Sequence, residues 1–263
     1  MTNSVSNALA DATATSYNAT GVTVATELTP ANPNALFVAN ADKVKNTNNV
    51  IVNNVCANLV LTDGYPFKAP ADFTATAATY ATTISSVGAG TLCLPFAAAI
   101  PEGVKAYTLN YTSGDKADAT EVSGTIDANT PVLTNGSGSV TFTGANAAII
   151  ADATNTVGAL TGVFETTAVP AGSYVLQNQE EDGLGFYQVA EGSVINAKPF
   201  RAYLTAQSAA RILKINFSDI TTGIEAVAVE TQQNGEVYDL QGRRVAQPAK
   251  GLYIVNGKKM MVK

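Results

Sequence analysis

The chain has 263 residues, a formal net charge of -6 and a pI near 4.7. Such an acidic chain is a poor partner for nucleic acid, because that binding depends on Lys and Arg neutralising phosphates. No apolar run reaches the roughly 18 residues that a transmembrane helix needs. Charged residues make up 14% of the chain against about 25% in an average soluble domain, so Thr, Asn, Ser and Gly must supply surface polarity. This composition favours strands and turns.

The first 25 residues are a mixture of Ala, Thr, Asn and Ser without sustained periodicity. We expect residues 1–25 to be a disordered or truncated segment. The segment has neither the basic start nor the compact apolar centre of a signal peptide. Either an export signal has been removed, or the sequence is a fragment of a longer gene product.

Residues 26–219 contain many short apolar runs with a period of two, separated by Gly, Pro or Asn-Gly. Asp63-Gly64 ends one such run, because Asp-Gly suits a turn with positive φ. Short strands with a turn about every ten residues are typical of a sandwich or barrel. We therefore predict an all-β fold with a β-sandwich body, and a β-solenoid remains an alternative for the segment before Tyr65. The main expected strands are residues 35–38, 49–52, 58–62, 92–96, 140–143, 174–176, 186–188, 200–204 and 213–217.

The chain contains no histidine. Ser-His-Asp and Cys-His nucleophiles and the usual His-bearing metal sites are therefore excluded. We predict a protein that is not an enzyme and has no catalytic residue, metal or cofactor. The remaining catalytic chemistry is a glycosidase pair of carboxylates. The candidates lie in or beside expected turns, where a solvated loop charge is the simpler interpretation: Asp63, Asp72, Glu165, Glu181 and Asp182.

The acidic turn at residues 180–183 lacks the alternating ligand spacing of a calcium loop, so an exposed turn is expected there. The two cysteines, Cys56 and Cys93, are too few for a disulfide framework. They form either one bridge in an oxidising compartment or two buried thiols on strands.

A glycan-binding surface usually offers flat aromatic rings, and the chain has no tryptophan. Tyr65, Tyr187 and Tyr203 are the candidates for such a surface. The alternative is that these tyrosines fill strand surfaces or cross-strand pairs.

The pattern sharpens near the C-terminus, where strands are expected at residues 237–240 and 243–245 with a turn at Gln241-Gly242. Residues 251–255 and 258–263 are apolar runs joined by Asn256-Gly257, the strongest short hairpin signal. We predict a small β-hairpin module over residues 223–263, joined to the body by a linker at residues 219–223. The alternative is that these strands complete the last sheet of the body.

Residues 238–243 and 250–258 resemble the C-terminal sorting domains of the type IX secretion system in Bacteroidetes. The resemblance implies a small β-structure that directs export across the outer membrane and is then removed. The full-type family tails are longer and immunoglobulin-like, so this tail resembles a short variant. By the same resemblance the sorting pattern is carried by Asp239, Gly242, Arg243, Gly251, Tyr253 and Lys258.

The body is also similar to segments at the ends of large Prevotella and Bacteroides surface proteins, some with adhesin-type leucine-rich repeats. Residues 56–64, 91–96 and 199–204 carry this resemblance. Together the two resemblances imply a non-catalytic structural or adhesion module that is secreted or lies on the outer cell surface. Its implied partners are the secretion machinery, through the tail, and a host protein or glycan. The alternative is a glycan-binding accessory module of a polysaccharide-utilisation system.

Overall fold

The computed structural model describes residues 9–217, 237–238, 251–255 and 258–262, the last three ranges through their backbone. Every regular element in these ranges is a β-strand, which confirms the predicted all-β fold. The chain divides into two compact units, residues 1–218 and 219–263. The boundary falls at the start of the predicted linker at residues 219–223. No helix in the described ranges is long and apolar enough to cross a membrane.

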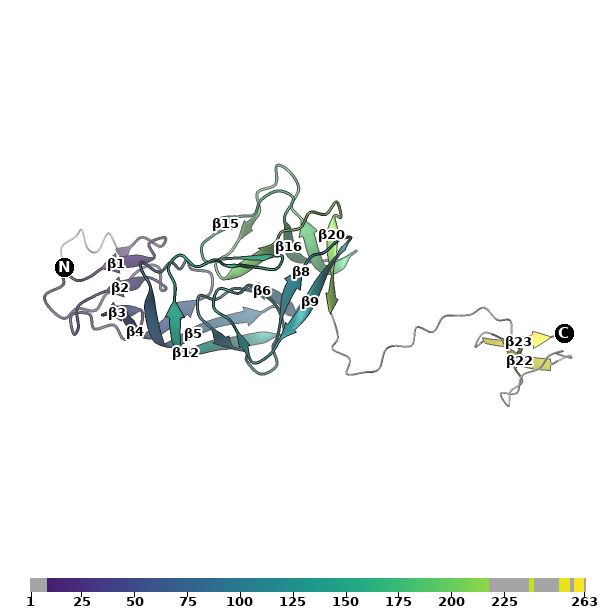
Figure 1. Ribbon diagram of the computed structural model, residues 1–263, viewed down its shortest axis with the longest axis horizontal. Helices are drawn as coiled ribbons and strands as arrows, with labels where there is room; N and C mark the ends of the chain where they lie inside the picture. Colours follow the sequence, from purple (N-terminus) through teal and green to yellow (C-terminus); the bar gives the residue numbers. More distant parts are fainter. Residues whose placement is uncertain (1–8, 218–236, 239–250, 256–257, 263) are drawn as a thin grey trace. The chain divides into compact units, whose positions relative to one another are not determined.

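The first sheet of the body is mixed and contains eight strands (Figure 1). Its longest members, β5 and β12, pair antiparallel along their whole length, and β4 runs parallel to β5. Phe73, Ala75 and Tyr80 of β5 are buried, whereas the threonines between them lie at the surface or only partly buried. In spatial order the strands are β1 (Ser16–Asn18), β2 (Leu36–Val38), β3 (Val50–Val52), β4 (Val55–Thr62), β5 (Phe73–Ile84), β12 (Gly138–Ile149), β7 (Ala98–Ala99) and β10 (Thr125–Ile126).

The edge of this sheet consists of the three short parallel strands β1, β2 and β3. Tyr17 of β1 stacks on Phe37 of β2, with ring centroids 5.4 Å apart. Leu9, Ala19 and Leu28 bury their side chains with Phe37 in a small separate core. The expectation of disorder over residues 1–25 is thus wrong for residues 9–25, while residues 1–8 lie outside the described ranges. The segment lacked a periodic signal because its strand has three residues and its core residues come from loops.

Strands β1, β2 and β3 stack in parallel, as in the solenoid alternative, but β3 and β4 form an antiparallel pair. The segment before Tyr65 is thus one side of the eight-stranded sheet. Buried asparagines hold its loops in place. The Asn34 side-chain amide donates to the carbonyls of Thr62 and Tyr65, at 2.9 Å each. The Asn49 amide donates to the carbonyls of Pro33 and Val60 at 2.9 Å. These side chains satisfy backbone groups that the short ladders leave unpaired.

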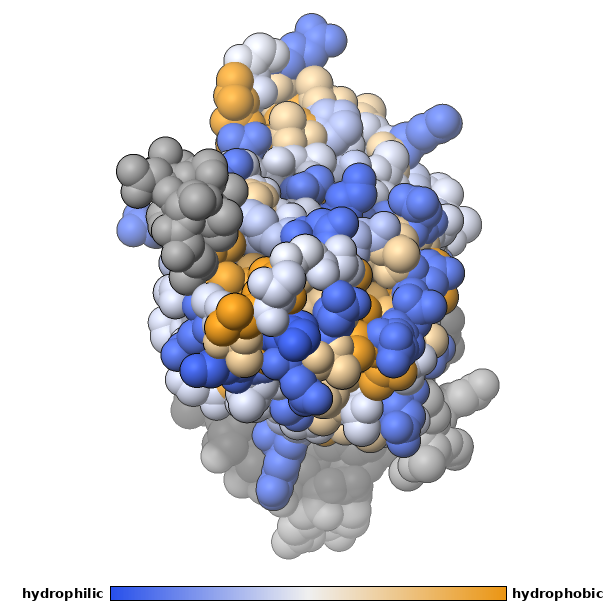
Figure 2. All heavy atoms as spheres, turned by 90° about the vertical axis from the view of Figure 1, so that its left-hand side faces the viewer, coloured by the Kyte–Doolittle hydropathy of each residue, from blue (hydrophilic) through white to orange (hydrophobic). Residues whose placement is uncertain are grey.

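Figure 2 shows the body from the side of these N-terminal strands. Apolar groups lie scattered between hydrophilic ones on this face. Scattered apolar groups of this kind are normal on the surface of a folded protein.

The second sheet contains ten strands and curls back on itself. Its last strand, β6, returns to β19, where Thr91 Oγ1 donates to the carbonyl of Ala202 (3.0 Å) and accepts from its amide (2.9 Å). The Cys93 amide donates to the carbonyl of Phe200 at 3.0 Å. We call this junction the β6–β19 seam. The spatial order is β13 (Thr156–Val157), β14 (Leu160–Val163), β19 (Arg201–Leu204), β16 (Tyr174–Gln179), β17 (Gly183–Gln188), β20 (Ile212–Phe217), β9 (Lys116–Val122), β8 (Lys105–Asn110), β11 (Val132–Asn135) and β6 (Ala89–Leu92).

Two cores result from this arrangement. The larger core lies between the eight-stranded sheet and the strands β6, β8 and β11, and the second lies within the curl of the other sheet. Strand β11 is therefore buried on both faces: Val132 belongs to the larger core and Leu133 to the second. A strand that is covered on both faces reads as a continuous apolar run instead of an alternating one.

A small antiparallel pair covers part of the second sheet: β15 (Thr167–Ala168) and β18 (Asn196–Ala197). The C-terminal unit holds a separate antiparallel sheet of β21 (Val237–Tyr238), β22 (Gly251–Val255) and β23 (Lys258–Val262). Val255 pairs with Lys258, which leaves a two-residue connection between β22 and β23 and confirms the predicted hairpin. The turn and return strand expected at residues 241–245 lie outside the described ranges.

Candidate functional site

The six residues of the sorting pattern divide into two groups. Gly251 and Tyr253 lie on β22 and Lys258 lies on β23, where Gly251 pairs with Val262 and Tyr253 with Met260. Asp239, Gly242 and Arg243 lie outside the described residues. The structure thus places half of the pattern on one hairpin, with β22 between β21 and β23.

The two cysteines are free thiols, so the bridge between Cys56 and Cys93 is not formed. Cys56 lies on β4 within the larger core, and Cys93 directly follows β6. The Cys93 side chain fills the space beside Gly162, where an added Cβ would lie 2.4 Å from its sulfur. Both thiols act as small buried hydrophobic groups. Burial raises the pKa of Cys56 and raises that of Cys93 to about 12.

We expect neither thiol to react with iodoacetamide in the native protein at pH 8, because a raised pKa leaves little thiolate and burial blocks access. After unfolding in guanidinium without reductant, both should be alkylated. Mass spectrometry of the intact chain measures this directly. If no label enters the unfolded chain until a reductant is added, the cysteines are bridged and the free-thiol assignment is wrong.

The five carboxylates that were candidates for a glycosidase pair lie in different surroundings. Asp72 accepts from the amide of Ala151 at 2.9 Å. Asp182 forms an exposed ion pair with Arg211, and Glu181 is exposed, as expected for an acidic turn. Asp63 differs from the expected loop charge, because it is partly buried and paired with Arg201. Within the described residues no group of three His, Cys, Asp or Glu side chains is placed to hold a metal ion.

The three candidate tyrosines do not form a common surface. Tyr187 is 4% exposed, and its hydroxyl donates to the carbonyl of Gly183 at 2.6 Å. Tyr203 is partly buried against the small core beneath β15 and β18. Tyr65, at 40% exposure, is the one of the three with an exposed side chain. Tyr187 and Tyr203 thus fill strand surfaces, the alternative interpretation of these residues.

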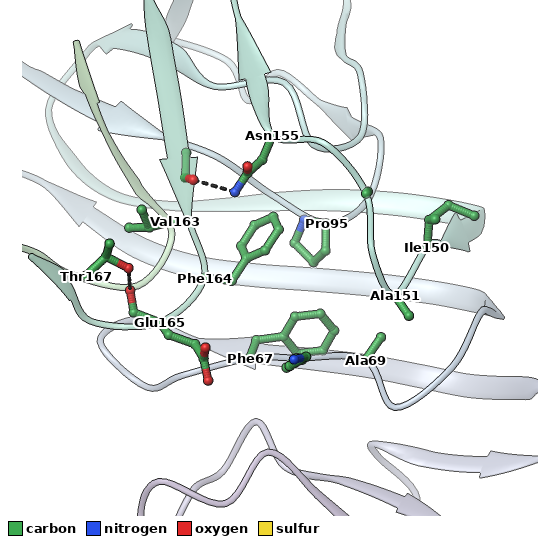
Figure 3. A pocket seen from close by; sticks show the side chains of 13 residues that line it. Phe67, Ala69, Pro95, Ile150, Ala151, Asn155, Val163, Phe164, Glu165 and Thr167 are labelled. Atoms are coloured by element: carbon green, nitrogen blue, oxygen red, sulfur yellow. Dashed lines mark hydrogen bonds between the residues drawn. The ribbon is translucent and has the colours of Figure 1, made fainter. Parts of the chain in front are cut away.

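A pocket of about 260 Å³ opens beside the connections that follow β4, β6, β12 and β14 (Figure 3). Figure 3 shows Phe67, Phe164 and Pro95 together on its wall, with Ile150 and Ala151 across from them. The rings of Phe67 and Phe164 meet edge to face, with centroids 6.3 Å apart. Both rings also pack against the buried Phe200.

The polar groups of this pocket are few. Asn155 donates to the carbonyl of Gly162, which ties its amide to the wall. Glu165 is the one carboxylate among the described lining residues, and Lys68 is the one amine. A glycosidase needs two carboxylates across the scissile bond. The pocket can therefore accept an amphipathic group, but it lacks the acid pair for that chemistry.

A second cluster joins the two sheets through Arg201. Its Nη2 lies 2.5 Å from Asp63 Oδ2, and its Nη1 donates to the Tyr80 hydroxyl at 2.9 Å. The Tyr80 hydroxyl in turn donates to Asp63 Oδ1 at 2.8 Å, and Thr82 Oγ1 donates to Oδ2 at 2.6 Å. Burial alone would raise the pKa of Asp63, but the bonds from Thr82 and Arg201 outweigh it, so this pKa lies below its ordinary value. Asp63 is thus held as a carboxylate.

Beside this cluster a pocket of about 240 Å³ lies at the β6–β19 seam. Its described lining residues include Arg201 but not Asp63, and they include the hydroxyl residues Thr82 and Thr134. The sequence-based interpretation did not single out Arg201, which lies 138 positions from Asp63. A usable signal was present: Arg201 is a lone charge in the run at residues 199–204, in a chain with few charges.

Comparison with known proteins identified no match: no family model, no curated protein and no solved structure resembles this chain significantly.

Proposed function

We propose that this chain is a non-catalytic structural or adhesion module that is secreted or displayed on the outer cell surface. The C-terminal strands act as a short sorting signal of the type IX kind. The observation that carries the proposal is the division of the chain at Ser218 into a large β body and a small unit with its own sheet.

A cleavable sorting signal needs a tail that folds apart from its cargo. The strands β21, β22 and β23 pair with one another in a sheet of their own. All hydrophobic cores described in the body are built from residues between Leu9 and Leu213. This separation supports the sorting role over the alternative that the last strands complete the final sheet of the body.

The composition of the body supports a passive surface role. The chain has no histidine, and the pocket with aromatic walls holds a single carboxylate among its described lining residues. The two sheets are joined by the Arg201–Asp63 ion pair, which suits a module that must keep its shape outside the cell. A glycan-binding role requires a site other than the tyrosines, because these do not share a surface.

We expect deletion of residues 219–263 to leave the thermal unfolding midpoint of the body unchanged and to abolish its surface display. The measurement is protease accessibility and antibody labelling of intact cells of a Bacteroidetes host, with the protein exported behind a host signal peptide. The truncated chain should accumulate in the periplasm. Arg211→Gln, an exposed change in the body, serves as the control and should be displayed normally. Normal display of the truncated chain would refute the sorting role.

A further inference from the structure

The seam pocket lies where the end of β5 meets β6, β11 and β19. At this place the second sheet closes through the Thr91 hydroxyl instead of a regular ladder, which leaves an opening between the two sheets. Its volume of about 240 Å³ lies just below the range of about 300–1,000 Å³ for drug-sized ligands. The pocket therefore suits one small ring.

The pocket has a single charge among its described lining residues, the guanidinium of Arg201. Asp63 holds this group from behind and does not line the pocket. The hydrogen bonds to Asp63 and Tyr80 use two of the five guanidinium N–H donors, as far as the described residues show. A guanidinium recognises a carboxylate through paired charge-assisted hydrogen bonds. An ammonium group would find no lining acid here, so an amino acid is a poor fit.

Residues with hydroxyl groups line the same pocket: Thr82, Thr83, Ser85, Thr91 and Thr134. The Thr83 side chain, however, lies on the opposite face of β5 from Thr82, where its Oγ1 is 3.4 Å from Ser139 Oγ. The hydroxyls of Thr82 and Thr134 donate to Asp63 and to the Gly90 carbonyl, and their oxygens can still accept. Ile84, Ala89 and Leu92 add apolar surface. A ring with several hydroxyls, apolar C–H faces and one carboxylate matches this set of groups.

The position of Arg201 is fixed from two sides. Asp63 and Tyr80 bind its guanidinium, and the preceding residue, Phe200, has a φ of 63° and is fully buried. A bulky residue in this left-handed region is unusual and strained, and such residues are typical of sites where geometry matters. The guanidinium is thus held in place before any ligand arrives.

From these observations we infer that the seam pocket binds a uronic acid, with the sugar carboxylate on Arg201 and the ring hydroxyls on the surrounding Thr and Ser side chains. The ligand is either a free monosaccharide or the terminal residue of an acidic polysaccharide. All lining residues of the site belong to the body, so the binding proposal is independent of the sorting role proposed for the tail.

The test uses the full chain, labelled with ¹⁵N, and follows amide shifts during titration with D-glucuronate and D-galacturonate. We expect saturable shifts at Thr83, Ser85, Gly90 and Arg201. Glucose and galactose, which lack the carboxylate, should bind at least about tenfold more weakly, as expected for loss of a charge-assisted hydrogen bond. Acetate and sulfate test whether any anion suffices. Trigalacturonate that binds more tightly than the monosaccharide identifies a chain end as the ligand, whereas equal affinity identifies the single residue.

Two variants separate binding from folding. Arg201→Lys keeps the positive charge but loses the paired N–H donors of the guanidinium. It should weaken the binding of glucuronate at least about tenfold. Ser85→Ala changes an exposed residue, should keep the melting temperature, and should still weaken binding several-fold. Arg211→Lys, whose ion pair with Asp182 lies outside the pocket, is the matched control. Three results would overturn the proposal. Glucose or sulfate binds as tightly as glucuronate, both pocket variants keep the wild-type affinity, or glucuronate causes no amide shift at a concentration 50-fold above a Kd of about 1 mM.

Discussion

Replacement of Arg201 by methionine is expected to lower the free energy of unfolding by about 2–3 kcal/mol. The change leaves the Asp63 carboxylate without its cation and the Tyr80 hydroxyl without its donor. Breaking a fully buried pair costs about 3–5 kcal/mol, and the expected value is lower because the side chains of Arg201 and Asp63 retain 28% and 29% exposure. Urea denaturation at pH 7 measures the difference.

Asp182→Asn serves as the control, because it breaks the exposed ion pair with Arg211 and should cost less than about 1 kcal/mol. Adding Asp63→Asn to Arg201→Met should recover part of the loss, since no unpaired charge remains. Equal costs for Arg201→Met and Asp182→Asn would show that the cluster contributes no more than a surface pair.

The cost of Arg201→Met should also depend on pH. The pKa of Asp63 is lowered in the folded chain, so its ionised form contributes stability above its ordinary pKa of about 3.9. This contribution is lost as the pH falls through the lowered value. The difference between wild type and Arg201→Met should therefore shrink below about pH 4. A constant difference between pH 7 and pH 3 would argue against the ion pair as its cause.

Phe200→Ala should lower the free energy of unfolding by about 3–5 kcal/mol, the usual cost of emptying a buried aromatic site. Phe200 is fully buried and packs against three aromatic rings, the nearest being Tyr80 with centroids 4.9 Å apart. The change therefore leaves a cavity between the two sheets. Denaturant unfolding of the purified variant gives the value.

The comparison with glycine makes this prediction specific. Phe200 has a φ of 63°, which glycine adopts without strain, so Phe200→Gly should be about 1 kcal/mol more stable than Phe200→Ala. Phe186, fully buried on the regular strand β17, provides the control. There the order should reverse, with glycine less stable than alanine by about 0.5–1 kcal/mol. The same order at both positions would contradict the left-handed backbone at Phe200.

The strand that contains Val140 shows where sequence patterns stop being informative. Alternation predicted a strand over residues 140–143, whereas β12 extends from Gly138 to Ile149. At Gly144 a side chain has no room, because a Cβ would lie 2.6 Å from the carbonyl oxygen of Ala97. Asn146 has a φ of 49° and is left out of the pairing with β5, and the residues around it are mostly alanine, both exposed and buried. This half therefore shows no regular hydrophobic alternation in the sequence.

Turns were predictable because their chemistry is local. Asp63-Gly64 ends β4, and the positive φ of Gly64 (81°) supplies the reason. The connection between β22 and β23 follows from Asn256-Gly257 in the same way. The Asn53-Asn54 turn between β3 and β4 also has positive φ at both residues, of 49° and 60°.

The sequence alone determined that this chain is built from strands, where several of them end, and which chemistries its missing histidine excludes. These properties depend on residue types and on neighbours within a few positions. The tertiary structure decided which strands pair, including the parallel pairs of β4 with β5 and β9 with β20. It also decided that Asp63, Tyr80 and Arg201 meet, and that a pocket opens beside them. A period of two shows which side chains share a face of a strand, but it does not identify the strand or sheet that packs on that face. The spacing of neighbouring residues contains no information on a contact between residues 138 positions apart, such as Asp63 and Arg201.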